Sequence, residues 1–213
     1  MGKTKSSVVG LDLAGSPKRN TGFCVMSSGL LCRVLTLHSD EEILSKTINA
    51  EPELVSIDAP LFLPKGRKSL EDRGPPHFRE CDKELLRMHI RFFPISLGPM
   101  RMLTSRGMKL RKELESTGLE VIESFPGAIQ DILGFPRKQA GIDKLAGALV
   151  EYGLKFDRPA TGLNGDELDA TTSALVGMMH LNGESRTIGD PAEGLMVLPA
   201  SRNQKPTGAQ GSA

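Results

Sequence analysis

The chain has 213 residues, and its 27 Lys and Arg residues nearly balance its 26 Asp and Glu residues. This length suits one domain, and the 23 glycines and 14 prolines exclude a coiled coil. No stretch approaches the roughly 20 apolar residues that a membrane-spanning helix needs. Three cysteines without a close pair do not support a zinc site and suit a reducing compartment. We therefore expect a cytoplasmic protein that does not bind a membrane.

The near-zero net charge hides an asymmetry along the chain. Residues 65–112 contain 13 basic and 5 acidic residues, a net charge of +8, whereas the rest of the chain has 14 basic and 21 acidic residues, a net charge of −7. A solvated helical surface and a surface that binds phosphate groups both explain this basic segment. The charge alone does not choose between them.

The first half of the chain predicts a three-stranded antiparallel meander. Its strands are 8–13, 22–26 and 30–37, joined by short turns. Ser39 is placed to cap a helix that has Glu42 as its third residue. That helix leads to a strand over 54–59, which we expect to lie parallel to the first strand.

The second half of the chain predicts helices alternating with strands. A helix is expected from Phe78 to Phe93, where Pro94 stops it. The further expected elements are helices over 99–115, 127–133, 138–152 and 166–181, a strand over 119–123 and a last strand-like segment over 194–198. Together these elements predict an α/β fold with a mixed five-stranded sheet and helices on both faces. We expect one domain over residues 1–199, with a basic helical insert over 65–112 and a flexible tail over 200–213.

Two aspartates lie at the ends of apolar strands. Asp12 ends Val-Val-Gly-Leu-Asp-Leu, and Asp58 lies in Val-Ser-Ile-Asp-Ala-Pro. A carboxylate in such a place is costly unless another group compensates its charge. A divalent cation is one such group, and a loop cap or a lysine partner is another.

A second acidic pair begins the last long helix. Asp166 and Asp169 are three residues apart, so they share one helix face. Ala170, Ser173 and Ala174 allow this helix to approach a sheet closely. The same spacing also fits a capping box in which Asp166 is the N-cap, and both interpretations stay open.

Glu123 is a fifth candidate because it ends the strand over 119–123; the alternative is an exposed residue of a half-buried strand. Carboxylates from separate segments that meet at strand ends suit Mg²⁺ or Mn²⁺. Such a cluster can hold two ions about 4 Å apart, which activate a water and stabilise the leaving oxygen of a phosphodiester.

These segments carry a resemblance to a known family. The order of Gly10-Leu-Asp-Leu-Ala-Gly15, a second strand, an Asp-ended fourth strand and a late Asp-x-x-Asp helix resembles the ribonuclease H-like superfamily. More narrowly, five motifs in order resemble the family called domain of unknown function 429, whose members are predicted nucleases. These motifs are Ile57-Asp-Ala-Pro-Leu61, Arg79-Glu-Cys-Asp82, Glu123-Ser-Phe-Pro126, Asp166-Glu-Leu-Asp-Ala170 and Glu193-Gly-Leu-Met-Val-Leu-Pro199.

The resemblance implies roles for individual residues. Asp12, Asp58, Asp166 and Asp169 would be the metal-binding carboxylates, and Glu123 would be a further acidic position of the site. Arg79 and Asp82 match a motif that ordinary ribonucleases H lack, which implies a more specialised substrate.

The leading hypothesis from the sequence is a nuclease or phosphodiesterase that uses Mg²⁺ or Mn²⁺ and binds nucleic acid, DNA or RNA. Arg79, Arg87 and Arg91 of the basic segment would neutralise substrate phosphates. Phe78, Phe92 and Phe93 can stack on bases, although their spacing also suits a hydrophobic core. One alternative is a nucleotide-binding phosphotransfer protein that uses the loop from Ala14 to Thr21. The other is a non-catalytic module that binds nucleic acid or protein.

Overall fold

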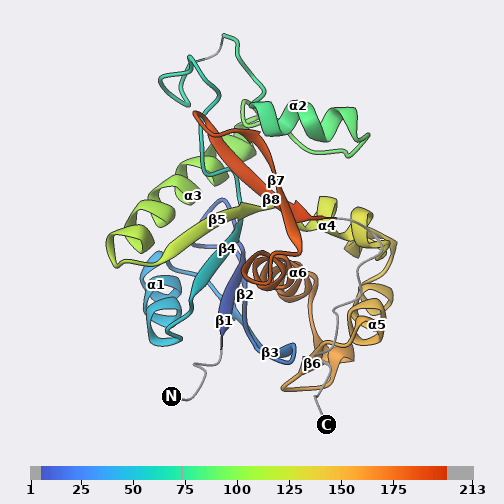
Figure 1. Cartoon of the computed structure of the whole chain (residues 1–213). Coiled ribbons are helices and arrows are strands. Elements are labelled where there is room, and N and C mark those ends of the chain that lie inside the picture. Colours follow the sequence, from blue (N-terminus) through green and yellow to red (C-terminus); the bar gives the residue numbers. More distant parts are fainter. Residues whose placement is uncertain (1–5, 73, 201–213) are drawn as a thin grey trace.

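The computed structural model describes residues 6–72 and 74–200. Except for Ala200, the expected tail lies outside these residues. A single eight-stranded sheet, in the order β6-β3-β2-β1-β4-β5-β8-β7, forms the centre of the molecule (Figure 1). The strands are β1 (Ser7–Asp12), β2 (Thr21–Ser27), β3 (Leu31–Leu37), β4 (Leu54–Asp58), β5 (Glu120–Ser124), β6 (Lys155–Phe156), β7 (Ser185–Asp190) and β8 (Gly194–Pro199).

The sheet confirms the expected mixed topology. β1, β2 and β3 form the antiparallel meander, and β4 and β5 continue the sheet in parallel with β1. This is the mixed α/β arrangement, an antiparallel meander followed by parallel strands, that the sequence predicted. The sheet has eight strands rather than five because three segments extend its edges. β6 has only two residues, and β7 buries only Ile188, so neither carries the apolar alternation that marks a strand in a sequence.

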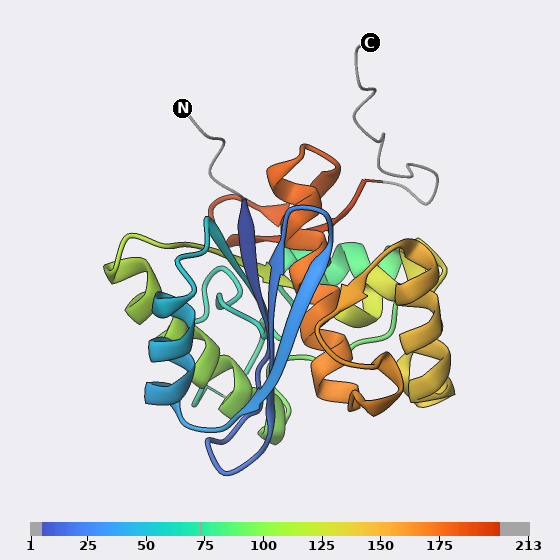
Figure 2. The ribbon, with the colours of Figure 1, turned by 90° about the horizontal axis from the view of Figure 1, so that it is seen from below.

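Helices cover both faces of the sheet, as expected (Figure 2). α1 and α3 lie on one face, whereas α4, α5 and α6 lie on the other. The Ser39 side chain accepts a hydrogen bond from the Glu42 N–H at 3.1 Å, which confirms the predicted cap of α1. The helices are α1 (Asp40–Asn49), α2 (Glu80–Arg87), α3 (Gly98–Ser116), α4 (Pro126–Leu133), α5 (Ile142–Tyr152) and α6 (Gly165–Leu181).

Two helices are shorter than their sequence patterns predicted. α2 ends at Arg87 and not at Phe93, because His89 takes a left-handed backbone conformation with φ 58°. The Ile90 N–H then bonds back to the Leu85 carbonyl, which turns the chain before Pro94 is reached. The expected helix over 138–152 divides into a short 3₁₀ turn at 138–140 and α5, because Gly141 between them has φ 138°.

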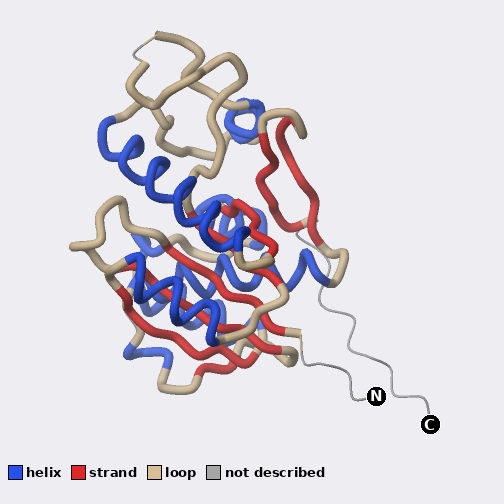
Figure 3. Tube along the Cα trace, turned by 90° about the vertical axis from the view of Figure 1, so that its left-hand side faces the viewer, coloured by secondary structure: helices blue, strands red, loops and turns tan. Residues whose placement is uncertain are grey.

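The basic segment over 65–112 is less helical than expected. It begins as a long loop that extends past the strands, and α2 after it lies beside β7 (Figure 3). The Arg67 guanidinium organises this loop by donating to the carbonyls of Asp72, Gly74 and Pro76. The part of the chain that the structure describes contains no helix that is both long and apolar enough to cross a membrane.

Alternation along the strands divides the core into two parts. Val8 and Leu54 pack into the core under α6, whereas Val9, Leu11 and Val55 pack into the core under α1 and α3. Successive side chains of a strand point to opposite faces. Two residues of one strand therefore face the same helices only if they are an even number of positions apart. This also holds for the residues at the end of a strand.

Candidate active site

Asp12 and Asp58 lie side by side on the α6 face of the sheet. They are register partners in the parallel pair β1–β4. Counting by twos from Val8 and from Leu54 reaches Asp12 and Asp58, so both carboxylates are on the face that α6 covers. Both side chains are partly buried. The expected pairing of these two aspartates is therefore present.

Glycines bring α6 unusually close to this part of the sheet. A Cβ on Gly10 would lie 2.1 Å from the Ala170 carbonyl oxygen, and a Cβ on Gly22 would lie 1.9 Å from the Asp166 carbonyl oxygen. Gly22 is itself the register partner of Asp12. The absence of side chains at these glycines therefore sets the N-terminal end of α6, with Asp166, beside the end of β1. The predicted close approach of α6 at Ala170 and Ala174 is confirmed.

The N-terminus of α6 is capped by Asn164. Its side-chain oxygen accepts hydrogen bonds from the N–H groups of Asp166 and Glu167, both at 3.0 Å. The Glu167 carboxylate in turn accepts from the Asn164 N–H, which completes a capping box. The alternative in which Asp166 and Asp169 form the cap is therefore wrong. Neither aspartate is needed to satisfy the backbone of the helix end.

A lysine that the sequence analysis did not single out contacts the carboxylates. The Lys138 Nζ lies 2.7 Å from an Asp169 oxygen, 3.4 Å from an Asp12 oxygen and 3.5 Å from an Asp166 oxygen. We call the three aspartates that Lys138 contacts, together with Asp58, the aspartate cluster: Asp12, Asp58, Asp166 and Asp169. One ammonium group therefore faces three of its four carboxylates.

The cluster holds more negative charge than its surroundings neutralise. Burial raises the pKa of Asp12 to about 7, because Lys138, which lowers it, does not offset the burial and the neighbouring carboxylates of Asp169 and Asp166. Burial, Asp12 and Asp169 also raise the pKa of Asp58 well above its usual value. The pKa of Lys138 is raised as well, since the carboxylates outweigh the effect of its burial. An arrangement of this kind favours the arrival of further positive charge.

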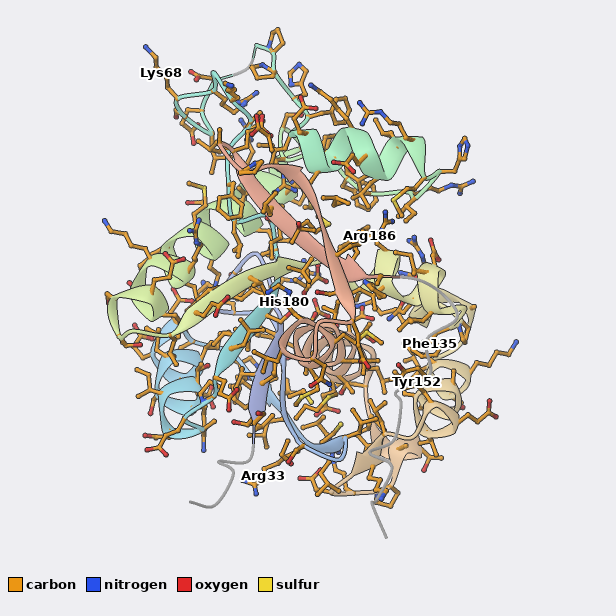
Figure 4. All side chains as sticks on the ribbon, viewed as in Figure 1. Arg33, Lys68, Phe135, Tyr152, His180 and Arg186 are labelled. Atoms are coloured by element: carbon orange, nitrogen blue, oxygen red, sulfur yellow. The ribbon has the colours of Figure 1, made fainter. Side chains whose placement is uncertain are left out.

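Gln130 on α4 orients the cluster from the side. The Gln130 amide donates to the Asp169 carboxylate at 2.7 Å and to the Thr172 hydroxyl at 3.3 Å. Phe135 and Tyr152 pack edge to face with ring centres 5.5 Å apart and join the chain after α4 to the end of α5 (Figure 4). The positions of Gln130 and Lys138 in the sequence did not indicate that they would contact the aspartates. Only the packing of α4 and α5 on α6 brings them there.

Glu123 does not join the aspartate cluster. It is the register partner of Ile57 and so lies on the opposite face of the sheet from Asp58. Its carboxylate accepts hydrogen bonds from the Leu61 N–H and from Arg79, both at 2.7 Å. Burial raises the pKa of Glu123, and Arg79 opposes that effect. The position of Glu123 fits a role in holding the loop that follows Asp58.

Arg79 and Asp82 belong to the same buried network as Glu123. The Arg79 guanidinium binds both oxygens of Asp82, at 3.1 and 2.8 Å, and its side chain is only 4% exposed. All three residues are buried. We call them the arginine network. Substrate binding by Arg79 and Asp82 stays a prediction, since in this arrangement the guanidinium contacts carboxylates and not solvent.

The remaining predicted phosphate contacts, Arg87 and Arg91, are exposed. Neither forms an ion pair with any residue that the structure describes. Another arginine of the basic segment, Arg106, is buried and donates to Asp40 and to the carbonyls of Ala14 and His38. The charge of the segment is therefore used partly for internal structure and partly at the surface.

Two hollows flank the aspartate cluster. A polar one of about 400 Å³ is lined by Asp12 and Asp166 together with Lys138, Arg19 and Asn20. A larger one of about 960 Å³ lies on the other side and shares only Asp58 with the cluster. The smaller hollow is the place where a ligand would meet two of the carboxylates, Asp12 and Asp166, beside Lys138. The larger one extends the site toward α2 and α3.

The cluster suits a divalent cation in chemistry and in charge. All its donors are carboxylate oxygens, which Mg²⁺ and Mn²⁺ prefer, and the Lys138 ammonium already provides a positive charge among three of them. Within residues 6–72 and 74–200, no group of three or more His, Cys, Asp or Glu side chains is arranged to hold one metal ion. Binding an ion would therefore require the carboxylates to move and Lys138 to yield its place.

Comparisons with known proteins give few neighbours. No protein-family model and no curated protein matches this chain. Membership of the domain of unknown function 429 family therefore stays a prediction. Among solved structures, the chain is similar to RuvC of Thermus thermophilus in complex with a Holliday junction substrate, with 16% identity and a TM-score of 0.47. A second RuvC structure from the same organism has 16% identity and a TM-score of 0.45, and both alignments cover 83% of this chain and 96% of RuvC.

Proposed function

We propose that this protein is a hydrolase that cleaves phosphodiester bonds of nucleic acid with two Mg²⁺ or Mn²⁺ ions. The observation that carries the proposal is the aspartate cluster itself. Four carboxylates from β1, β4 and α6 gather at one place, three of them facing one ammonium group, although none of them is required to cap the helix. Such an excess of buried negative charge costs stability and is therefore retained for a function.

Each part of the site has a task in this proposal. Asp12, Asp58, Asp166 and Asp169 hold the cations, which supply an activated water and stabilise the leaving oxygen. Lys138 neutralises part of the cluster before the cations bind. Gln130 fixes the orientation of Asp169, and the exposed Arg19 at the rim of the polar hollow neutralises a substrate phosphate.

The same proposal includes the finer assignments from the sequence. It takes residues 1–199 as one domain with an insert over 65–112, and the chain as a member of the domain of unknown function 429 family. Arg87 and Arg91 contact phosphates of the bound strand, since both are exposed and free of ion pairs with described residues.

A cleavage assay with matched variants tests the proposal. Single-stranded, duplex, hybrid and four-way branched oligonucleotides are incubated with Mg²⁺ or Mn²⁺, with a chelator as the metal-free control. We expect cleavage by the wild type, and loss of cleavage in chelator and in Asp12→Asn. Asp143→Asn removes an equal charge from an exposed position on α5 and should cleave like the wild type.

Three results would count against the proposal. Equal cleavage by Asp12→Asn and the wild type would remove the aspartate cluster from the reaction. Absence of both cleavage and metal-induced thermal stabilisation would favour a non-catalytic binding module. Saturable ATP binding without cleavage would favour the phosphotransfer alternative.

A further inference from the structure

The larger hollow beside the aspartate cluster is an apolar cleft. Its volume of about 960 Å³ lies within the range of small-molecule sites, roughly 300–1,000 Å³. Asp58 and Ser124 line it from the ends of β4 and β5, and Phe125 follows directly. Its other walls come from α2, the segment after it and the start of α3, with Leu86, Phe92 and Phe93 among the lining side chains.

Two neighbouring aromatic side chains of the cleft differ in their surroundings. Phe92 is half-buried and packs edge to face on Phe78, with ring centres 6.0 Å apart. Phe93 is 71% exposed, and nearby Leu86 is 50% exposed. Phe93 therefore presents a free aromatic surface at the cleft, held in place by a neighbour that is anchored. An exposed aromatic at a cleft is typical of a binding surface.

The cleft also contains an unsatisfied polar group. Ser124 is 2% exposed, and its hydroxyl has no hydrogen-bond partner. It is the register partner of Asp58, so it lies directly beside the aspartate cluster. A buried hydroxyl without a partner costs free energy. A ligand with a polar edge would relieve that cost, whereas a purely aliphatic ligand would not.

We propose that this cleft takes up one nucleobase that has left its stack, next to the phosphate at the aspartate cluster. The inference rests on the proposed function and specifies its substrate: a strand with an unpaired or readily unpaired base at the cleavage position. A base has the required combination of features. Its flat face stacks on Phe93, its polar edge bonds to the Ser124 hydroxyl, and its attached phosphates remain within reach of the carboxylates.

Arginines as well as carboxylates line the cleft, and Arg79 is already paired with Asp82 and Glu123, so a phosphate would meet the other arginines. Arg91 lines the cleft, is exposed and has no ion pair with a described residue. Arg137 lines it as well and lies 5.9 Å from the centre of the Phe125 ring, although its guanidinium pairs with Asp131. Aromatic side chains beside a free arginine are the combination that binds single-stranded nucleic acid.

Binding measured without metal tests this inference separately from catalysis. The probe is a DNA duplex with one bulged 2-aminopurine nucleotide, whose fluorescence reports loss of stacking and transfer to a new environment. Its competitors are the fully paired duplex and the same bulge with the base removed. In chelator, we expect the full-length protein to prefer the base-containing bulge over both competitors by about tenfold.

Variants assign the preference to the cleft. Phe93→Ala and Ser124→Ala should each reduce the preference while leaving affinity for the paired duplex unchanged. Met102→Ala removes another exposed apolar side chain that does not line the cleft and should behave like the wild type. Ser124→Ala deletes a hydroxyl that has no partner, so it should fold at least as stably as the wild type.

The outcomes separate this inference from the proposed function. Equal affinity for the base-containing and base-free bulges, or a preference that survives Phe93→Ala and Ser124→Ala together, would overturn the cleft assignment. Metal-dependent cleavage that Asp12→Asn abolishes would still support the nuclease. Failure to bind any of the three duplexes would overturn the cleft assignment as well, and the cleavage assay would decide the nuclease separately.

Discussion

Two groups of charged side chains lie at the same edge of the sheet, one on each face, and they differ in how completely they are paired. In the arginine network, one guanidinium satisfies two buried carboxylates, and a backbone N–H completes the set. In the aspartate cluster, three of the four carboxylates share one lysine and Asp58 has no cationic partner among the described residues, and the pKa values of Asp12 and Asp58 are raised. A network whose charges are nearly balanced holds the chain in place. A cluster whose carboxylates are only partly neutralised can bind a further positive charge.

Breaking the arginine network should have the largest effect on stability. Arg79→Met leaves the carboxylates of Asp82 and Glu123 buried without their partner, which we expect to lower the free energy of unfolding by about 3–5 kcal/mol. Urea unfolding measures the change. Arg87→Met alters an exposed arginine of the same helical region and should stay within about 0.5 kcal/mol of the wild type. A loss below about 1 kcal/mol for Arg79→Met would contradict the structural role of the network.

The aspartate cluster should make the metal-free protein less stable as the pH rises. The pKa of Asp12 is raised to about 7 in the folded protein from the 3.8 of an unperturbed aspartate, so the folded state binds this proton more tightly than the unfolded state. The free energy of unfolding should fall between about pH 4 and pH 7, by about 4 kcal/mol from this group, and then level off. Asp58 acts in the same direction.

Urea unfolding in chelator across that pH range measures this effect. Asp12→Asn cannot ionise, so its profile should be much flatter than that of the wild type, and it should be the more stable protein at pH 7. Coincident profiles for the two proteins would show that Asp12 does not titrate as its surroundings indicate.

Metal addition should stabilise the protein through the aspartate cluster and not through the arginine network. Mn²⁺ at 100 times its dissociation constant should add about 2.7 kcal/mol to the free energy of unfolding, and Asp12→Asn should abolish the gain. Lys138→Gln removes the competing ammonium group, so we expect tighter Mn²⁺ binding by calorimetry. Lys144→Gln, an exposed lysine on α5, is the control. Weaker Mn²⁺ binding by Lys138→Gln would mean that the lysine supports the cation instead of competing with it.

The smallest expected change in stability comes from disturbing the close approach of α6 to the sheet. Gly22→Ala places a Cβ against the Asp166 backbone, which should displace the start of α6 and cost about 1–3 kcal/mol. Gly147→Ala adds the same methyl group where no atom lies within 4 Å and should be neutral or slightly stabilising. Thermal unfolding compares the two variants. If Gly22→Ala unfolds like the wild type, the close approach does not position Asp166.

Local patterns predicted much of this molecule because the underlying signals are local. Apolar runs bounded by turns marked the strands of the meander, and Ser39 with Glu42 marked the start of α1. The predicted last residue of α2 and the predicted first residue of α5 were wrong. His89 and Gly141 adopt backbone conformations there that helix periodicity does not reveal. The N-cap of α6 was misassigned by two residues because Asn164 and Asp166 are both good capping residues.

The sequence by itself determined that apolar strands end in aspartates and that the last helix carries two more. Tertiary structure decided which of these carboxylates meet, because strand register and side-chain alternation place Asp12 and Asp58 on the α6 face and Glu123 on the other. It also brought Lys138 to the cluster and joined Phe93 and Ser124 in one cleft. These contacts join residues far apart in the chain, and their geometry depends on how whole elements pack, which no local pattern specifies.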